Sequence, residues 1–197
     1  MSISHVATLK SAFLTRSTAL TNVALIAGGV GFLTILAQIS LPVPGSPVPV
    51  TGQTLGALLI GSAYGASLGL TTFATYIAIG VVGAPVFAQA NSGMSSLSGA
   101  TGGYLVGMLI ATNITGALAG RKWDQRIRTV LPTMLTGTFF IFTPGLIWLH
   151  HVTSQSWAWT FSKGLTPFIF GEVIKIAIAS TLLPSLWKII RVNSHNN

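Results

Sequence analysis

Residues 17–120 contain no Asp, Glu, Lys, Arg or His, and this uncharged run constrains the fold more than any other feature of the chain. Over all 197 residues, only 6% are charged and 50% are hydrophobic. A soluble domain has roughly a quarter charged residues, which hydrate its surface. The composition therefore excludes an ordinary soluble protein and predicts an integral membrane protein.

The apolar segments predict an all-α bundle of six transmembrane helices that forms a single domain over residues 1–197. A perpendicular crossing needs about 20 residues, so the short second and third segments form either two spans or one interrupted span. We favour two spans because Gly61, Gly65 and Gly69 interrupt the run. The six predicted spans are 19–41, 53–64, 68–82, 104–119, 130–149 and 165–187.

The basic residues predict the orientation of the bundle. With six spans, both termini and the loops after the second and fourth spans share one side of the membrane. Positive charge is enriched on the cytoplasmic side, so we assign that side to the cytoplasm. Because the charges form short clusters between apolar segments, we expect contact with membrane lipid and not with nucleic acid. Lys163 falls outside, and the cytoplasmic set is Lys10, Arg16, Arg121, Lys122, Arg126, Arg128, Lys188 and Arg191.

Aromatic and histidine side chains mark the predicted span ends. The tryptophans at 123, 148, 157, 159 and 187 all fall near such ends, which is typical of an aromatic belt at the membrane surface. His150 and His151 lie at a similar boundary. The chain has no cysteine, and no carboxylate or spaced third histidine accompanies this pair. We therefore expect interface residues here and no metal site.

Glu172 and Lys175 are the main candidates for a functional site. They are three positions apart, so they share one face of the last predicted helix. Glu172 lies about 7 residues into that span, roughly 10 Å below its outer end. Each charge inside a span costs on the order of 2.5–3.5 kcal/mol, so such a pair is a functional-site hypothesis. A purely structural ion pair is the alternative.

The residue types around this pair favour ligand binding over catalysis. A proton relay needs several titratable groups in a row, and no nucleophile–base set or metal cluster is available. A urea-like group fits the pair, because its N–H groups donate to Glu172 and its carbonyl accepts from Lys175. We expect no enzymatic activity and no cofactor. The polar residues expected to bind the rest of the ligand are Gln53, Gln89, Asn91 and Tyr104.

Two loops and one helix face complete the prediction. Residues 42–52 contain four prolines and predict an ordered, non-helical turn at a membrane face. Residues 83–103 are glycine-rich and uncharged, which indicates either a cavity lining or a flexible surface loop. In the first span, the small-residue pairs Ala24–Gly28 and Ala27–Gly31 allow another helix to approach closely, either from this chain or from a partner.

Four stretches, in order, resemble the BioY family, the biotin-binding S components of energy-coupling-factor (ECF) vitamin transporters. They are PVPVTGQTLG (47–56), GAPVFAQANSG (83–93), TGGYLVG (101–107) and PFIFGEVIK (167–175). The resemblance runs from about residue 18 to residue 187, nearly the whole chain. It implies a six-helix bundle with an outward-facing pocket that captures biotin at a bacterial cell membrane.

The resemblance also implies roles for particular residues. An acidic residue and a lysine of the last helix hold the ureido ring in this family, and they match Glu172 and Lys175. A loop asparagine that helps to hold the ligand matches Asn91. The family usually has Asp where this chain has Glu172. No arginine lies between Arg16 and Arg121, so neutral donors or water are expected to meet the biotin carboxylate.

The partners implied by the resemblance are a transmembrane coupling protein and two ATP-binding subunits. S components typically dock through small residues of their first helix, which here are Ala24, Ala27, Gly28 and Gly31. Some members of the family work without these subunits, and the sequence leaves both arrangements open. The alternatives are an S component for another vitamin, or a membrane scaffold or small channel with a structural Glu–Lys pair.

Overall fold

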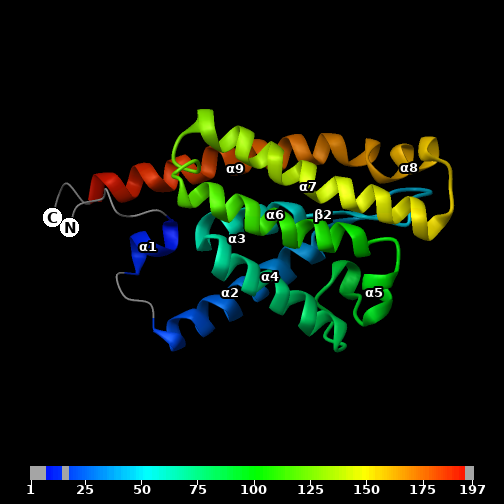
Figure 1. Ribbon diagram of the computed structural model, residues 1–197, viewed down its shortest axis with the longest axis horizontal. Coiled ribbons are helices and arrows are strands. Elements are labelled where there is room, and N and C mark those ends of the chain that lie inside the picture. Colours follow the sequence, from blue (N-terminus) through cyan, green and yellow to red (C-terminus); the bar gives the residue numbers. More distant parts are fainter. Residues whose placement is uncertain (1–7, 15–17, 194–197) are drawn as a thin grey trace.

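The computed structural model describes residues 8–14 and 18–193, and this part of the chain is almost entirely helical (Figure 1). The predicted all-α class is confirmed, apart from one pair of two-residue strands. The elements in order are α1 (Leu9–Phe13), α2 (Ala19–Gln38), β1 (Ser40–Leu41), β2 (Val50–Thr51), α3 (Gln53–Tyr64), α4 (Ala66–Val81), η2 (Ala88–Ala90), α5 (Met94–Ser98), α6 (Gly102–Gly120), α7 (Ile127–Thr153), α8 (Trp157–Gly164) and α9 (Thr166–Asn193).

Four stretches are long and apolar enough to cross a membrane, namely α2, α6, α7 and the stretch Trp157–Arg191 that α8 and α9 form together. Helix α4 is apolar but shorter, and the count of six spans stays a prediction. Helices α3 and α4 are separate because Gly65, with φ +82° and ψ 173°, ends one helix and begins the next. Glycine is favoured at such a positive φ.

Helix α6 is the packing centre of the bundle and contacts α7, α3 and α4. Its glycines permit close approach: a Cβ at Gly107 would lie 2.5 Å from the Ile141 carbonyl oxygen of α7. A Cβ at Gly116 would lie 2.5 Å from the Ala66 nitrogen. Small residues serve this purpose in membranes, where lipid provides no hydrophobic drive between helices. Consequently, 61% of the most apolar 18-residue stretch of α6 is buried. The corresponding stretch of α2, at the periphery of the bundle, is only 17% buried.

The proline-rich turn folds as a short hairpin at one end of the bundle. Strands β1 and β2 pair antiparallel, with Ser40 opposite Thr51 and Leu41 opposite Val50. Ser46 Oγ donates to the Lys163 carbonyl oxygen at 2.9 Å, which attaches the hairpin to α8. The segment is therefore ordered and non-helical, as predicted.

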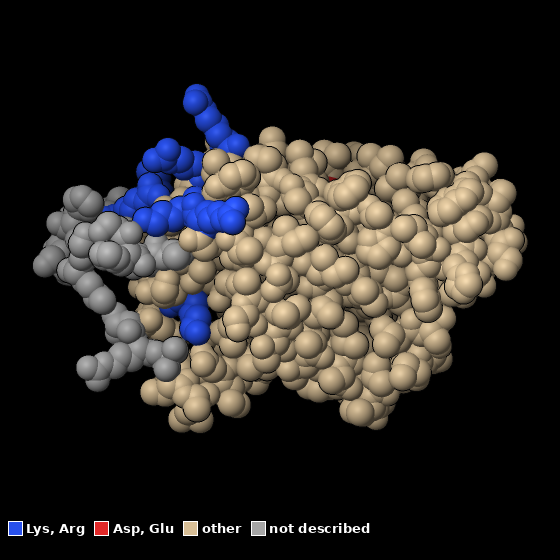
Figure 2. All heavy atoms as spheres, in the orientation of Figure 1, with Lys and Arg blue, Asp and Glu red and all other residues tan. Residues whose placement is uncertain are grey.

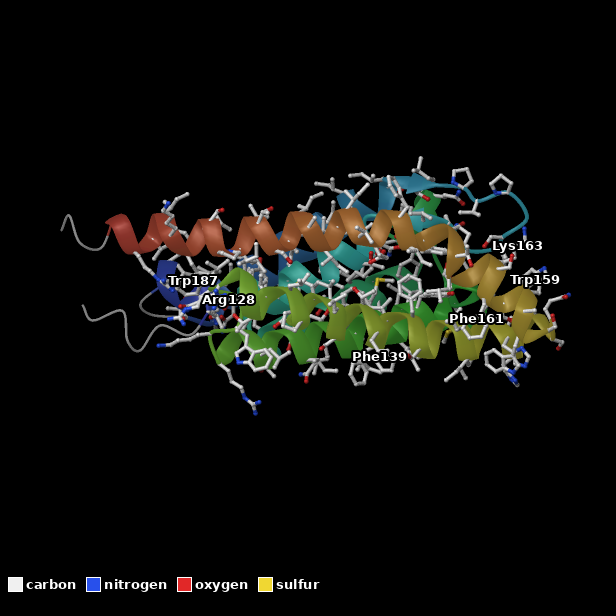
Figure 3. The ribbon with its side chains drawn as sticks, turned by 90° about the horizontal axis from the view of Figure 1, so that it is seen from above. Arg128, Phe139, Trp159, Phe161, Lys163 and Trp187 are labelled. Carbon is white, nitrogen blue, oxygen red and sulfur yellow. The ribbon has the colours of Figure 1, made fainter. Side chains whose placement is uncertain are left out.

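Basic side chains gather at the opposite end, beside α1 and the C-terminal end of α9 (Figure 2). In Figure 3, Lys163 and Trp159 lie at the hairpin end, whereas Arg128 and Trp187 lie at the basic end. Arg16, which the sequence assigned to the basic side, is outside the described residues. The assignment of the basic end to the cytoplasm stays a prediction.

Trp187 is not a membrane-surface residue, and the aromatic-belt prediction is wrong at this position. Its side chain is fully buried, and its indole Nε1 donates to Asp124 Oδ2 at 2.6 Å. Asp124 belongs to the loop between α6 and α7 and is also fully buried. A buried tryptophan usually donates its indole N–H to an acceptor, and Asp124 provides that acceptor for Trp187. Trp123 and Trp148, which are 39% and 37% exposed, fit the belt better.

Burial raises the pKa of the Asp124 carboxyl from 3.8 to about 6. The Trp187 hydrogen bond, a bond from its own backbone and the Arg191 charge lower it and offset part of the rise. The Oδ1 atom is buried and accepts no hydrogen bond. The ionised carboxylate is thus disfavoured in the folded protein relative to the unfolded chain.

We expect the free energy of unfolding to fall as the pH rises from about 4 to about 6, and then to level off. Because the folded-state pKa of Asp124 is raised, the folded protein binds more protons than the unfolded chain within this window and loses stability as they are released. Asp124→Asn should flatten this slope. The measurement is unfolding of the detergent-solubilised proteins across this pH range. An identical pH slope in the wild type and the variant would contradict the assignment.

Candidate functional site

An ion pair and a hydroxyl form a closed network between α3 and α9. Lys175 Nζ lies 2.7 Å from Glu172 Oε1, and the two side chains are 12% and 6% exposed. Thr54 Oγ1 donates to the same Glu172 oxygen at 2.8 Å and accepts from Lys175 Nζ at 2.9 Å. The three side chains are therefore joined through Glu172 Oε1, Thr54 Oγ1 and Lys175 Nζ, all largely buried. Charge-assisted hydrogen bonds of this kind are among the stronger ones in proteins.

A cavity of about 270 Å³ lies against this network. The proline-rich turn, the glycine-rich loop and helices α3, α6, α7 and α9 all contribute to its wall. Of the six predicted ligand-binding residues, the structure brings five to the lining, namely Gln53, Gln89, Asn91, Tyr104 and Lys175. Thr54 also lines the cavity, and sequence reasoning missed it.

Glu172 stands behind Lys175 and Thr54 and is not part of the cavity lining. Its Oε1 atom accepts both hydrogen bonds of the network, whereas Oε2 is buried and accepts none. Glu172 borders a second, mostly apolar cavity between α7, α8 and α9. In this arrangement the carboxylate positions the Lys175 ammonium. A ligand N–H meets Glu172 directly only when the side chain turns its second oxygen towards the first cavity.

Gln53 and Tyr104 shape the cavity while their polar atoms bond to the scaffold. Gln53 Nε2 donates to the Tyr76 hydroxyl at 2.7 Å, and its Oε1 accepts from the Thr51 hydroxyl at 3.2 Å. The Tyr104 hydroxyl donates to the Gly164 carbonyl oxygen at 2.8 Å. Tyr104 therefore lines the cavity while its hydroxyl is bonded to the scaffold.

An aromatic wall extends from Tyr104 towards the ion pair. The Tyr104 ring stacks on Phe168 with centroids 6.2 Å apart and meets Phe142 edge-on at 5.8 Å. All three residues line the cavity. The cavity thus combines an apolar wall with a cationic donor at one side, which suits a ligand with a polar head on an apolar body.

The glycine-rich loop forms another wall of the cavity. Gln89 and Asn91 are both exposed, and Asn91 Nδ2 donates to the Ala88 carbonyl oxygen at 3.0 Å. The backbone is left-handed at Gln89 and Ala90, with φ +59° and +56°. Gln38 of α2 holds this conformation, because its Oε1 accepts from Ala90 N at 3.0 Å and its Nε2 donates to the Phe87 carbonyl oxygen at 3.1 Å. The sequence offered one signal for the role of Gln38, namely a single amide side chain at the end of an apolar helix.

The small-residue face of α2 is open to the outside of the bundle. The residues that the sequence proposed for docking are all exposed, and they are Ala24, Ala27, Gly28 and Gly31. A Cβ added at Gly28 or Gly31 would have no neighbour within 4 Å. Within the described residues, these positions are therefore not used to pack α2 against its own bundle.

The histidine pair shows no features of a metal site. Across residues 8–14 and 18–193, no three His, Cys, Asp or Glu side chains lie close enough together to hold a metal ion. The His150 ring stacks on Trp157 with centroids 3.9 Å apart. This contact packs the end of α7 against the start of α8, so His150 has a structural role there.

The sequence matches the BioY family over residues 8–192. The chain belongs to the BioY family. The biotin transporter BioY2 of Lactococcus lactis subsp. cremoris (strain MG1363) is 30% identical over 185 residues, which cover 92% of this chain and 97% of that protein. The biotin transporter BioY of Thermotoga maritima is 30% identical, and the alignment covers 84% of this chain and 96% of that protein.

A solved structure shows the same fold. The crystal structure of the S-component for biotin from an ECF-type ABC transporter matches with a TM-score of 0.78, over 88% of this chain and 95% of that chain. At 24% identity, this likeness concerns the fold alone. Together with the apolar helices, membership of the BioY family makes this chain a multi-pass membrane protein.

We expect Gln38→Ala to loosen the glycine-rich loop, because it removes the acceptor of Ala90 N and the donor to Phe87 O. Hydrogen exchange of the Ala90 amide should accelerate on the order of tenfold, which corresponds to about 1.4 kcal/mol for a typical hydrogen bond. The control is Gln38→Glu, which keeps the acceptor and should keep Ala90 protected. Equal exchange rates in Gln38→Ala and the wild type would refute the role of Gln38.

Proposed function

We propose that this chain captures biotin from outside a bacterial cell, as the S component of an ECF-type transporter. One observation carries the proposal: in a member of the BioY family, Lys175 is fixed by Glu172 and Thr54 at the wall of a ligand-sized cavity. The curated relatives are named as biotin transporters, which supports the choice of ligand. The proline-rich turn that lines the cavity lies at the end of the bundle opposite the basic side chains (Figures 1 and 2), which supports opening to the outside.

The ureido ring of biotin is the part that fits the ion pair. Its carbonyl oxygen accepts from the Lys175 ammonium, and its N–H groups meet Glu172 when the carboxylate turns towards the cavity. The apolar sulfur-containing ring then packs on the wall of Tyr104, Phe142 and Phe168. The carboxylate-bearing tail extends towards the proline-rich turn and the glycine-rich loop. Asn91, Gln89 and Gln53 belong to the remaining lining.

The energetic argument favours a binding role for the pair over a scaffold role. A charge at the centre of a membrane helix costs about 2.5–3.5 kcal/mol, and two apolar residues at positions 172 and 175 would carry no such penalty. The network leaves Lys175 at the cavity surface, where its ammonium is available to an acceptor. A purely structural pair would not need to place its ammonium group at a cavity wall.

This proposal assigns the chain a binding and transport role without catalysis. In this proposal, energy comes from a transmembrane coupling protein and two ATP-binding subunits. The open face of α2, with Ala24, Ala27, Gly28 and Gly31, is the proposed docking surface for the coupling protein. Uptake by cells with and without the candidate ATP-binding subunits tests whether this chain also transports alone. Both termini would lie in the cytoplasm.

Calorimetric titration of the purified protein with biotin tests the ligand. We expect saturable binding by the wild type and a loss of at least about 100-fold in Lys175→Met, because a charged hydrogen bond and its pairing with Glu172 are both lost. Lys188→Met, an exposed lysine at the basic end, should bind like the wild type. Binding of thiamine or riboflavin in place of biotin would indicate another vitamin. Absence of any saturable binding would favour a scaffold.

Thr54→Val tests the hydroxyl that joins α3 to the ion pair. Removal of Oγ1 deprives Glu172 of a donor and Lys175 of an acceptor, so we expect biotin affinity to fall about tenfold. Thr54→Ser keeps the hydroxyl and should retain most of the affinity. Thr71→Val, on the exposed side of α4, is the control for loss of a threonine hydroxyl. Unchanged affinity in Thr54→Val would remove Thr54 from the site.

A further inference from the structure

Lys163 is set apart from the other surface cations of this chain. The other described lysines and arginines lie at the basic end, apart from Lys175 inside the ion pair (Figure 2). Lys163 lies on α8 at the hairpin end, where Figure 3 shows it beside the proline-rich turn. Among the residues that the structure describes, Lys163 is therefore the surface cation that lies at the same end of the molecule as the cavity.

Lys163 does not itself line the cavity, but two backbone connections place it beside segments that do. Its carbonyl oxygen accepts from Ser46, which directly precedes the lining residues Pro47, Val48 and Pro49. The next residue, Gly164, accepts from the hydroxyl of the cavity residue Tyr104. Lys163 thus lies next to the proline-rich turn and to the end of α6 that carries Tyr104, both of which contribute to the cavity wall.

The charge of Lys163 has no acidic partner. The chain has only two acids: Glu172 is paired with Lys175, and Asp124 lies at the other end with Trp187. The Lys163 ammonium donates to the Pro44 carbonyl oxygen at 3.4 Å, a long and neutral contact. Gly45 makes room for it, since a Cβ there would lie 2.9 Å from Nζ. An uncompensated cation beside the cavity wall attracts anions.

We propose that Lys163 makes the site selective for ligands with an anionic tail, by attracting the ligand carboxylate to the proline-rich turn while Lys175 receives the polar head. The inference rests on the proposed function, in which biotin is the ligand. It replaces the expectation that only neutral donors or water meet the carboxylate. The ammonium moves from a weak contact with Pro44 O to a charged acceptor. Such charge-assisted bonds are roughly twice as strong as neutral ones.

A structural explanation of Lys163 predicts something different. A lysine in the last turn of α8 interacts favourably with the helix dipole, and its side chain also holds Pro44. If that were its whole role, loss of the ammonium would weaken charged and uncharged ligands equally. An effect confined to the charged ligand distinguishes electrostatic selection from maintenance of the proline-rich turn.

The test compares biotin with biotinamide, in which a neutral amide replaces the carboxylate, on the full-length protein in detergent. We expect Lys163→Gln to lower the association rate and affinity for biotin about three- to tenfold at low salt, and to leave biotinamide within twofold. The biotin effect should shrink as the ionic strength rises, because the screening length falls from about 30 Å at 0.01 M to about 3 Å at 1 M. Lys163→Arg should behave like the wild type.

Lys188→Gln removes the same charge from the basic end and should leave both ligands unaffected. Equal losses for biotin and biotinamide in Lys163→Gln would overturn the proposal in favour of a structural role. No loss for either ligand would overturn it as well. If the wild type binds neither ligand, the proposed function fails and the inference falls with it. Wild-type binding of biotin with an unaffected Lys163→Gln refutes the inference alone.

Discussion

The hydrogen-bonded ion pair of Lys175 and Glu172 is the interaction around which the site is built. Inside an apolar bundle, neither charge has water to solvate it, so each requires a partner from the protein. Thr54 joins the pair from α3, and the three side chains together fix α3 and α9 relative to each other. Under the proposed function, a polar ligand group that enters the cavity would join this network through Lys175, which lines the cavity wall.

The geometry of this network depends on packing elsewhere in the bundle. Helix α6 lies close to α7 because Gly103 and Gly107 carry no Cβ, and close to the α3–α4 junction because of Gly116. This close packing sets where α3 presents Thr54 and where Tyr104 places its ring. A larger residue at Gly107 would separate α6 from α7 and displace the aromatic wall from the lysine. Packing by small residues is therefore part of how the site is positioned.

The sequence predicted what depends on local spacing or composition and failed where distant partners decide. The all-α membrane fold followed from the uncharged run, and the Glu172–Lys175 contact followed from a three-residue spacing on one helix. Thr54 meets Lys175 across 121 positions of the chain, which no local pattern reveals. Trp187 obeys the span-end rule in sequence, yet Asp124 provides a buried acceptor that draws it inside. The family motifs identified the cavity segments, but not which polar atoms the scaffold already uses.

Because this chain has only two acidic residues, the position of each lysine or arginine can be interpreted separately. With only two carboxylates, a cation is either paired with one of them, placed in the basic cluster at the α1 end, or left to attract something from outside. Lys175 belongs to the first group and the cytoplasm-assigned residues to the second. Lys163 is excluded from both by its position on α8. The asymmetry on which the predicted orientation rests thus also leaves one positive charge beside the proline-rich turn, on which the proposed selection of anionic ligands depends.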